Sequence, residues 1–156
     1  MSTLRLLDPP DQIVIFRVGR SCYGLDISIV EEILGEVEVT RVPDAPAGVT
    51  GIARVRNQVV PIFDLFWKFG VDHPADGAET RTIMVQHGDG TVALYVGPVE
   101  EVVSLPSEAY QNVRAPGDGS SLSYLRGVAR WGEELVLWID PEPLIPALAA
   151  TLANAA

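Results

Sequence analysis

Two stretches of this chain repeat one pattern: GIARVRNQVVPIFD at residues 51–64 and GVARWGEELVLWID at residues 127–140. A second match lies upstream of each copy and in the same order, VEEI at residues 30–33 and VEEV at residues 99–102. Chance similarity between two hairpins is the alternative, because Val and Ile are common in any strand. The ordered second match favours an internal duplication. Identical residues in the long copies are Gly51/Gly127, Ala53/Ala129, Arg54/Arg130, Val60/Val136 and Asp64/Asp140.

The length of each repeat indicates the kind of fold. A unit of roughly 65–75 residues is too long for a solenoid repeat and suits a small β-barrel. Many short β-rich runs separated by turn residues predict an all-β protein with two related barrel modules. We expect these modules at about residues 12–72 and 80–140, with the polar connector 73–80 between them and a tail at residues 1–11.

A few segments depart from the strand pattern. Residues 28–34 place apolar side chains at i,i+4 spacing, which predicts a short helix. A single helical turn is expected at residues 65–70, closed by its glycine. We expect a C-terminal helix and tail at residues 141–156, with a leucine face over 141–153. Pro61 cannot donate to a ladder, so its strand should lie at an edge or be irregular there.

Composition and charge exclude several classes of partner. The chain has 156 residues, 47% of them hydrophobic, and a net charge of −10. Such an acidic surface repels phosphate backbones and anionic lipid, so no nucleic-acid binding is expected. No run approaches the ~20 apolar residues of a membrane helix, so we expect no direct membrane insertion and a cytoplasmic location. Cys22 is the single cysteine, which rules out a disulfide within the chain.

Catalytic chemistry finds little support in the sequence. His73 and His87 are the only histidines, and their spacing fits no metal site, so both are expected on the surface. Cys22 lacks a companion base and is interpreted as a buried or half-buried structural residue. Adjacent glutamates on a strand or helix point apart, so they do not make an acid–base pair. We therefore predict no enzyme, no metal and no cofactor.

Binding residues are easier to nominate. Arg54 and Arg56 lie two positions apart, so on a strand they would share one face and form a recognition patch for acidic groups. A solvated hairpin tip is the plainer alternative. Trp131 and Trp138 lie seven residues apart in the last hairpin. Tryptophan is enriched at the centres of interfaces, and a position in the core is an equally good interpretation.

Several further motifs follow one another in a fixed order along nearly the whole chain. They resemble those of the CheW-like family, the coupling proteins of bacterial chemotaxis arrays. The matching stretches are IFR at 15–17, YGLDI at 23–27, VEEI at 30–33, VPDAP at 42–46, GI at 51–52, RNQVVPIFDL at 56–65, YLRGVA at 124–129 and LVLWID at 135–140.

The resemblance implies a fold and a role. The fold would be two intertwined SH3-like five-stranded barrels across residues 12–145, without cofactor or catalysis. The role would be to couple the cytoplasmic tips of methyl-accepting chemoreceptors to the regulatory domain of a CheA-type histidine kinase, in the cytoplasm beside receptor arrays at the inner membrane. Barrel-to-barrel contacts in this family can also close into rings, so self-association is a further expectation. The alternative is a scaffold in a non-chemotaxis kinase pathway or in a polar localisation complex.

The resemblance also carries over individual residues. Val30 and Glu32 match family positions implicated in receptor binding, although Val30 also suits a barrel core. Arg56 matches the arginine of the family's Asn-Leu-Arg-Gly hairpin, which here reads Arg54-Val55-Arg56-Asn57. Asn57 stands where the family has glycine and is expected to supply the left-handed backbone of the turn. The predicted partner-binding set is Val30, Glu32, Arg54, Arg56 and Asn57.

Overall fold

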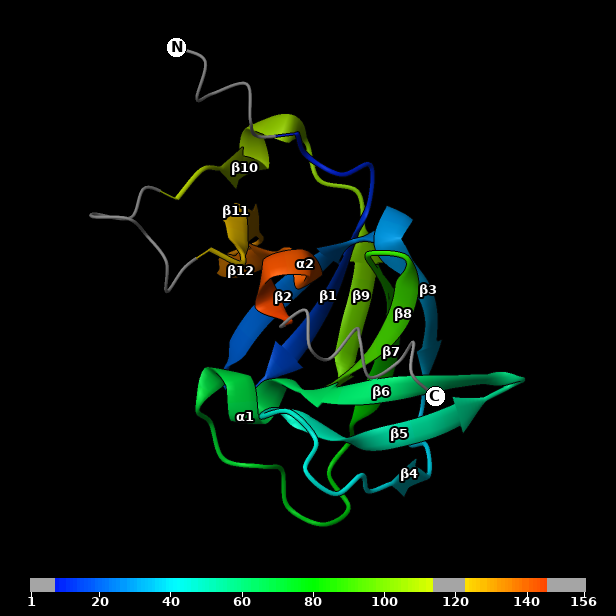
Figure 1. Cartoon of the computed structure of the whole chain (residues 1–156). Helices are drawn as coiled ribbons and strands as arrows, with labels where there is room; N and C mark the ends of the chain where they lie inside the picture. The colour runs from blue at the N-terminus through cyan, green and yellow to red at the C-terminus, as the bar shows by residue number, and fades with distance from the viewer. Residues whose placement is uncertain (1–7, 114–122, 146–156) are drawn as a thin grey trace.

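The computed structural model describes residues 8–113 and 123–145, which form two β-sheets with short helical turns (Figure 1). Sheet A has the strand order β10-β11-β12-β2-β1-β9, and sheet B has the order β3-β7-β8-β6-β5-β4. Sheet A contains β1 (Ile13–Val18), β2 (Ser21–Asp26), β9 (Val99–Val103), β10 (Tyr110–Gln111), β11 (Leu125–Trp131) and β12 (Glu134–Ile139). Sheet B contains β3 (Val30–Leu34), β4 (Val39–Thr40), β5 (Val49–Val55), β6 (Gln58–Asp64), β7 (Arg81–His87) and β8 (Gly90–Val96).

The predicted all-β class is confirmed. Each sheet has six strands, one more than the five expected in each barrel. The additional strands are β4 and β10, each only two residues long and each at one edge of its sheet. Strands of this length carry too little periodicity to be recognised in a sequence.

The repeated sequence corresponds to a repeated structure. The hairpin β5–β6 in sheet B and the hairpin β11–β12 in sheet A pair in the same register, with Arg54 opposite Val59 and Arg130 opposite Leu135. The second strand of each hairpin then runs parallel to another strand, β6 beside β8 and β12 beside β2. The two stretches therefore hold equivalent places in the two sheets.

The sheets do not coincide with the sequence repeats. Sheet B uses residues 30–96 without interruption, whereas sheet A combines residues 13–26 with residues 99–139. The connector 73–80 joins the helix α1 (Leu65–Phe69) to β7, so both its ends belong to sheet B. The hairpin β1–β2 thus completes a sheet made mostly from the second half of the chain, which intertwines the two halves.

Three groups of buried apolar side chains hold these sheets. The central cluster joins both sheets and includes Phe16 and Leu25 from sheet A with Phe63 and Leu94 from sheet B. Burial of each such side chain contributes about 1.5–3 kcal/mol. The sheet A cluster contains Ile13, Ile15, Cys22, Tyr110, Ala129, Val136 and Trp138. The sheet B cluster contains Ala53, Val55, Val60, Ile62, Met84 and Ala93.

The helix predicted at residues 28–34 was wrong. A 3₁₀ turn covers only Ile27–Ile29, and β3 follows at once, paired with β7. The register shifts between Val30 and Glu32, which marks a β-bulge. Because a bulge adds one residue, Val30 and Ile33 both pack against the central cluster although they are three positions apart. Apolar spacing of this kind resembles that of a helix.

The two predicted helical segments had different outcomes. The helical turn closed by glycine is confirmed, since α1 ends at Gly70 in the left-handed conformation with φ 69°. Asp64, which was not predicted to act here, caps the N-terminus of α1. The C-terminal helix α2 covers only Pro141–Leu144, because Ile145 has an extended backbone with ψ 125°. The rest of the helix predicted over 141–153 lies outside the described residues.

Pro61 lies at a change in the pairing of β6. It is opposite Ile52 of β5, but only the following residues, Ile62 to Asp64, pair with β8. The first half of β6 therefore has a ladder on one side alone, which accommodates a residue without an N–H. The second half is interior to sheet B.

The central cluster gives a first prediction. Leu94→Ala should lower the free energy of unfolding by about 2–5 kcal/mol, because Leu94 is 0% exposed and its loss leaves a cavity. Leu135→Ala is the matched control: Leu135 is 60% exposed, so its truncation should change stability by less than about 0.5 kcal/mol. Urea denaturation of both variants measures the difference. Equal losses would contradict the central role of this cluster.

Candidate functional site

An ion pair joins the strand β3 to the turn between β5 and β6. Arg56 Nε donates to Glu32 Oε1 at 3.2 Å, and Arg56 Nη2 donates to Glu32 Oε2 at 2.5 Å. This two-pronged arrangement fixes both the distance and the plane of the guanidinium. The Arg56 side chain remains 74% exposed and that of Glu32 29% exposed. The sequence placed these residues 24 positions apart, and the fold brings them together at the surface of sheet B.

The turn that presents Arg56 differs from the prediction. Arg56 itself adopts the left-handed backbone, with φ 58°, whereas Asn57 does not. The predicted role of Asn57 as the left-handed residue was therefore wrong. A side chain other than glycine is strained in this region by roughly 1 kcal/mol or more. The paired contact with Glu32 holds the arginine in place despite that strain.

The ion pair also affects the pKa of its carboxylate. The hydrogen bond from Arg56 lowers the pKa of Glu32, because the bond favours the charged carboxylate. The pair is accordingly ionised throughout the neutral range. Both charges remain accessible to a partner, since neither group is enclosed.

Val30 does not share a surface with Glu32. Val30 lies opposite Val85 and packs against the central cluster, whereas Glu32 lies opposite Met84, a member of the sheet B cluster. The bulge between Val30 and Glu32 places them on opposite faces of β3. Val30 is half-buried and connects the site to the core.

Arg54 lies on β5, exposed and opposite Val59, which is 38% exposed. The prediction that Arg54 and Arg56 share one strand face was wrong, because β5 ends at Val55 and Arg56 belongs to the turn. Arg54 makes no ion pair within the described part of the chain. Asn57 is exposed beside Arg56 at the hairpin tip. The hairpin thus presents two arginines and a valine around one ion pair.

Sheet A contains a charged cluster that the sequence did not reveal. Arg17 Nη2 donates to both carboxylate oxygens of Glu134, at 2.9 and 2.8 Å, and Arg17 Nε lies 3.4 Å from Glu100. The Cys22 thiol donates to Glu134 Oε1 at 3.2 Å. The Glu-Glu doublets at residues 100–101 and 133–134 were the available signal, since each contributes one glutamate to this cluster. Nothing in the sequence pointed to Arg17 as their partner.

The two histidines differ in their exposure to solvent. His73 is exposed, as predicted, but His87 is buried, with Nε2 3.3 Å from the carbonyl of Glu142 and 3.2 Å from that of Ile145. The prediction of a surface His87 was wrong because its strand end is covered by α2.

Trp138 is wholly buried in the sheet A cluster. Within residues 8–113 and 123–145, no group of three His, Cys, Asp or Glu side chains could hold a metal ion.

The buried thiol yields a second prediction. Burial raises the pKa of Cys22 to about 11, and the hydrogen bond to Glu134 acts in the same direction. Because only the thiolate reacts, the rate of alkylation by iodoacetamide should still be rising at pH 10. Glu134→Gln should lower that pKa in part, since Arg17 then stands near the thiolate without its carboxylate. A rate that levels off below pH 9.5 in the unmodified chain would contradict this assignment.

The fold and the site together define a class of protein. Two intertwined sheets with equivalent hairpins form a duplicated all-β module, and one of these hairpins carries an exposed ion pair. Comparison with known families makes this specific. The chain belongs to the family of CheW-like domains, whose model matches residues 12–149.

Curated proteins and solved structures agree with this assignment. The chain is 31% identical over 134 residues to the chemotaxis protein CheW of Klebsiella aerogenes, covering 86% of this chain and 81% of that protein. It is 27% identical over 137 residues to the chemotaxis protein CheW of Treponema pallidum, covering 85% and 81%. The crystal structure of the scaffolding protein TtCheW from Thermoanaerobacter tengcongensis superposes with a TM-score of 0.78 at 26% identity, covering 87% and 92%.

Proposed function

We propose that this chain is a non-catalytic adaptor that couples chemoreceptors to a CheA-type histidine kinase in chemotaxis signalling. The observation that carries the proposal is the CheW-like match across residues 12–149. Relatives named chemotaxis protein CheW and a neighbour named a scaffolding protein support it. The partners would be the cytoplasmic tips of methyl-accepting receptors and the regulatory domain of the kinase.

The surface around the Glu32–Arg56 pair is the proposed contact. An exposed guanidinium beside a carboxylate offers directional hydrogen bonds to a charged partner, and Arg54 adds a second cation. Val59 supplies an exposed apolar contact on the same hairpin. A polar rim with a small apolar element is typical of non-obligate interfaces. Val30 would act indirectly, by fixing β3 against the core.

The chemistry of the one thiol supports a binding role over a catalytic one. A catalytic cysteine needs a lowered pKa, which creates thiolate at neutral pH. Burial and Glu134 instead raise the pKa of Cys22 to about 11. The thiol is therefore protonated and unreactive under physiological conditions.

The adaptor would work at the cytoplasmic side of the inner membrane, beside the receptor arrays. Among the helices in the described segments, none has the length and apolar character needed to cross a bilayer. Attachment to the membrane would therefore depend on the receptors, and self-association into rings would be a further contact between copies.

Charge reversal at the hairpin tests the proposal. We expect the chain to bind the CheA-type regulatory domain from its own genome in the micromolar range, about −8 kcal/mol. Arg56→Glu should weaken binding to that domain or to a receptor tip by about tenfold or more, because it places like charges at the contact. Calorimetric titration measures the affinity, and circular dichroism should show an unchanged fold.

A double variant that swaps the two charges is the matched control. The double variant Glu32→Arg with Arg56→Glu restores an ion pair in the opposite direction. Binding should stay weak in this variant if partners read the charges themselves, and it should recover if the pair only braces the hairpin. Arg130→Glu, on the equivalent hairpin of sheet A, controls for net charge. Normal binding by Arg56→Glu would overturn the site, and no binding to either partner would favour a scaffold in another kinase pathway or a polar complex.

A further inference from the structure

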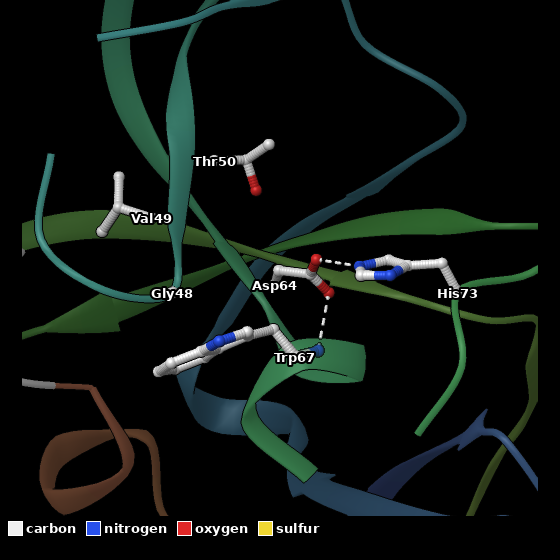
Figure 2. A pocket seen from close by; sticks show the side chains of 6 residues that line it. All are labelled: Gly48, Val49, Thr50, Asp64, Trp67 and His73. Atoms are coloured by element: carbon white, nitrogen blue, oxygen red, sulfur yellow. Dashed lines mark hydrogen bonds and ion pairs between the residues drawn. The ribbon is translucent and has the colours of Figure 1, made fainter. Parts of the chain in front are cut away.

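A pocket of about 190 Å³, seen from close by in Figure 2, opens at the base of the β5–β6 hairpin. Arg56 lies at the other end of this hairpin, in the turn between the two strands. The pocket lies where the first residues of β5, the last residue of β6 and the helix α1 meet. Its place in the fold separates it from the surface of the Glu32–Arg56 pair. The lining residues are Gly48, Val49, Thr50, Asp64, Trp67 and His73.

A nearly buried carboxylate faces this pocket. Asp64 is only 9% exposed, and its Oδ1 accepts hydrogen bonds from the N–H groups of Phe66 at 2.9 Å and Trp67 at 3.2 Å. The repeat-equivalent residue Asp140 caps α2 in the same way, with Oδ1 accepting from Glu142 N at 3.0 Å. Capping therefore explains Oδ1 in both copies. It does not explain Oδ2 of Asp64, which contacts the His73 side chain.

The side chain of Trp67 lines the same pocket as this carboxylate and is partly exposed to solvent. Trp67 is 49% exposed, and its ring packs edge to face against that of Phe63, with 6.3 Å between the ring centroids. Gly48, at φ 89°, lies so close that a Cβ there would be 2.5 Å from the Phe63 ring and 2.7 Å from the Trp67 ring. The backbone and Phe63 thus fix the indole while about half of its surface remains available. A fixed, exposed indole beside a carboxylate is suited to a cation.

His73 occupies the place that such a cation would take. Its side chain is 58% exposed, comes from the connector between α1 and β7, and meets the carboxylate through Nε2 (Figure 2). An imidazole is a planar N–H donor, so it presents to Asp64 the same kind of group as one edge of a guanidinium. Its ring centroid lies 5.8 Å from that of Phe66, and more than half of the side chain is open to solvent. A hydrogen-bond donor from a partner protein could therefore replace His73 at Asp64 Oδ2.

We propose that this pocket binds the guanidinium of an arginine side chain presented by a partner protein. The guanidinium stacks on Trp67 and donates to Asp64 Oδ2 after His73 moves aside. Arginine is favoured over lysine because its planar cation stacks on an indole and pairs directionally with a carboxylate. The segment between α1 and β7 adds attraction for a cationic partner through the exposed carboxylates of Asp72 and Asp76. A third carboxylate of this segment, Glu79, is paired with Arg81 at 2.7 Å. The site stands independently of the proposed kinase and receptor contacts.

A peptide titration tests the ligand chemistry directly. Acetyl-Gly-Arg-Gly-amide is added to the full-length protein labelled with ¹⁵N, and the indole N–H signals of its three tryptophans are followed. The Trp67 signal should shift in a saturable way, while those of Trp131 and the buried Trp138 stay fixed. The same peptide with neutral citrulline should give no such shift. Equal shifts with citrulline, or a Trp67 signal that does not move, would overturn the proposal.

Variants separate the contributions, with affinity read from the backbone amide of Thr50. Trp67→Ala should weaken binding about two- to fivefold, the range of an exposed cation–π contact. His73→Ala should tighten it by a similar factor, because the competing group is gone. Asp64→Asn should abolish it, whereas Asp140→Asn, the matched change in the other capping residue, should leave it intact. Unchanged affinity in both Trp67→Ala and His73→Ala would contradict the proposed geometry.

Discussion

The fold depends on the apolar contact between the two sheets. Sheet A cannot form from either half of the chain alone, because β1 and β2 come from the first half and β9–β12 from the second. Phe16 and Leu25 on the N-terminal strands then pack against Phe63 and Leu94 of sheet B in the central cluster. Because the two sheets share this core, we expect the duplicated chain to unfold as a single cooperative unit.

This arrangement determines how the hairpin β5–β6 is displayed. The base of β6 is paired on both sides and buried, whereas its first half is paired with β5 alone (Figure 1). The tip therefore projects from a fixed base and would be free to sway. The ion pair between Arg56 and Glu32 ties it to β3, which is itself anchored by Val30. A restrained charge loses less entropy on binding than a mobile one.

The sequence predicted the features that rest on strong local signals. The duplication, the all-β class, the helical turn before Gly70 and the buried Cys22 all follow from residue patterns or backbone chemistry, and the structure confirms them. Long-range geometry was beyond those signals. The bulge in β3 imitated helical spacing, and it also separated Val30 from Glu32, which the motif alone placed together. The bond between Arg17 and Glu134 joins residues 117 positions apart, and no local pattern predicts it.

The same distinction applies to the site. The family motif nominated Glu32 and Arg56 separately, and the structure shows them as one ion pair. It also shows Arg56 in place of Asn57 as the left-handed residue, a choice that turn geometry makes and composition does not. The pocket at Trp67 and Asp64 had no sequence signal, because its walls come from β5, β6, α1 and a connector. Only the folded backbone brings these segments to one place.

The most direct test of the adaptor role is receptor-dependent kinase activity in a reconstituted system. Membranes containing a receptor from the same genome are mixed with its CheA-type kinase, and kinase phosphorylation is measured with and without this chain. Receptors should change kinase activity only when the chain is present, and an attractant should then alter that activity. Receptor control that is identical with and without the chain would contradict the adaptor role.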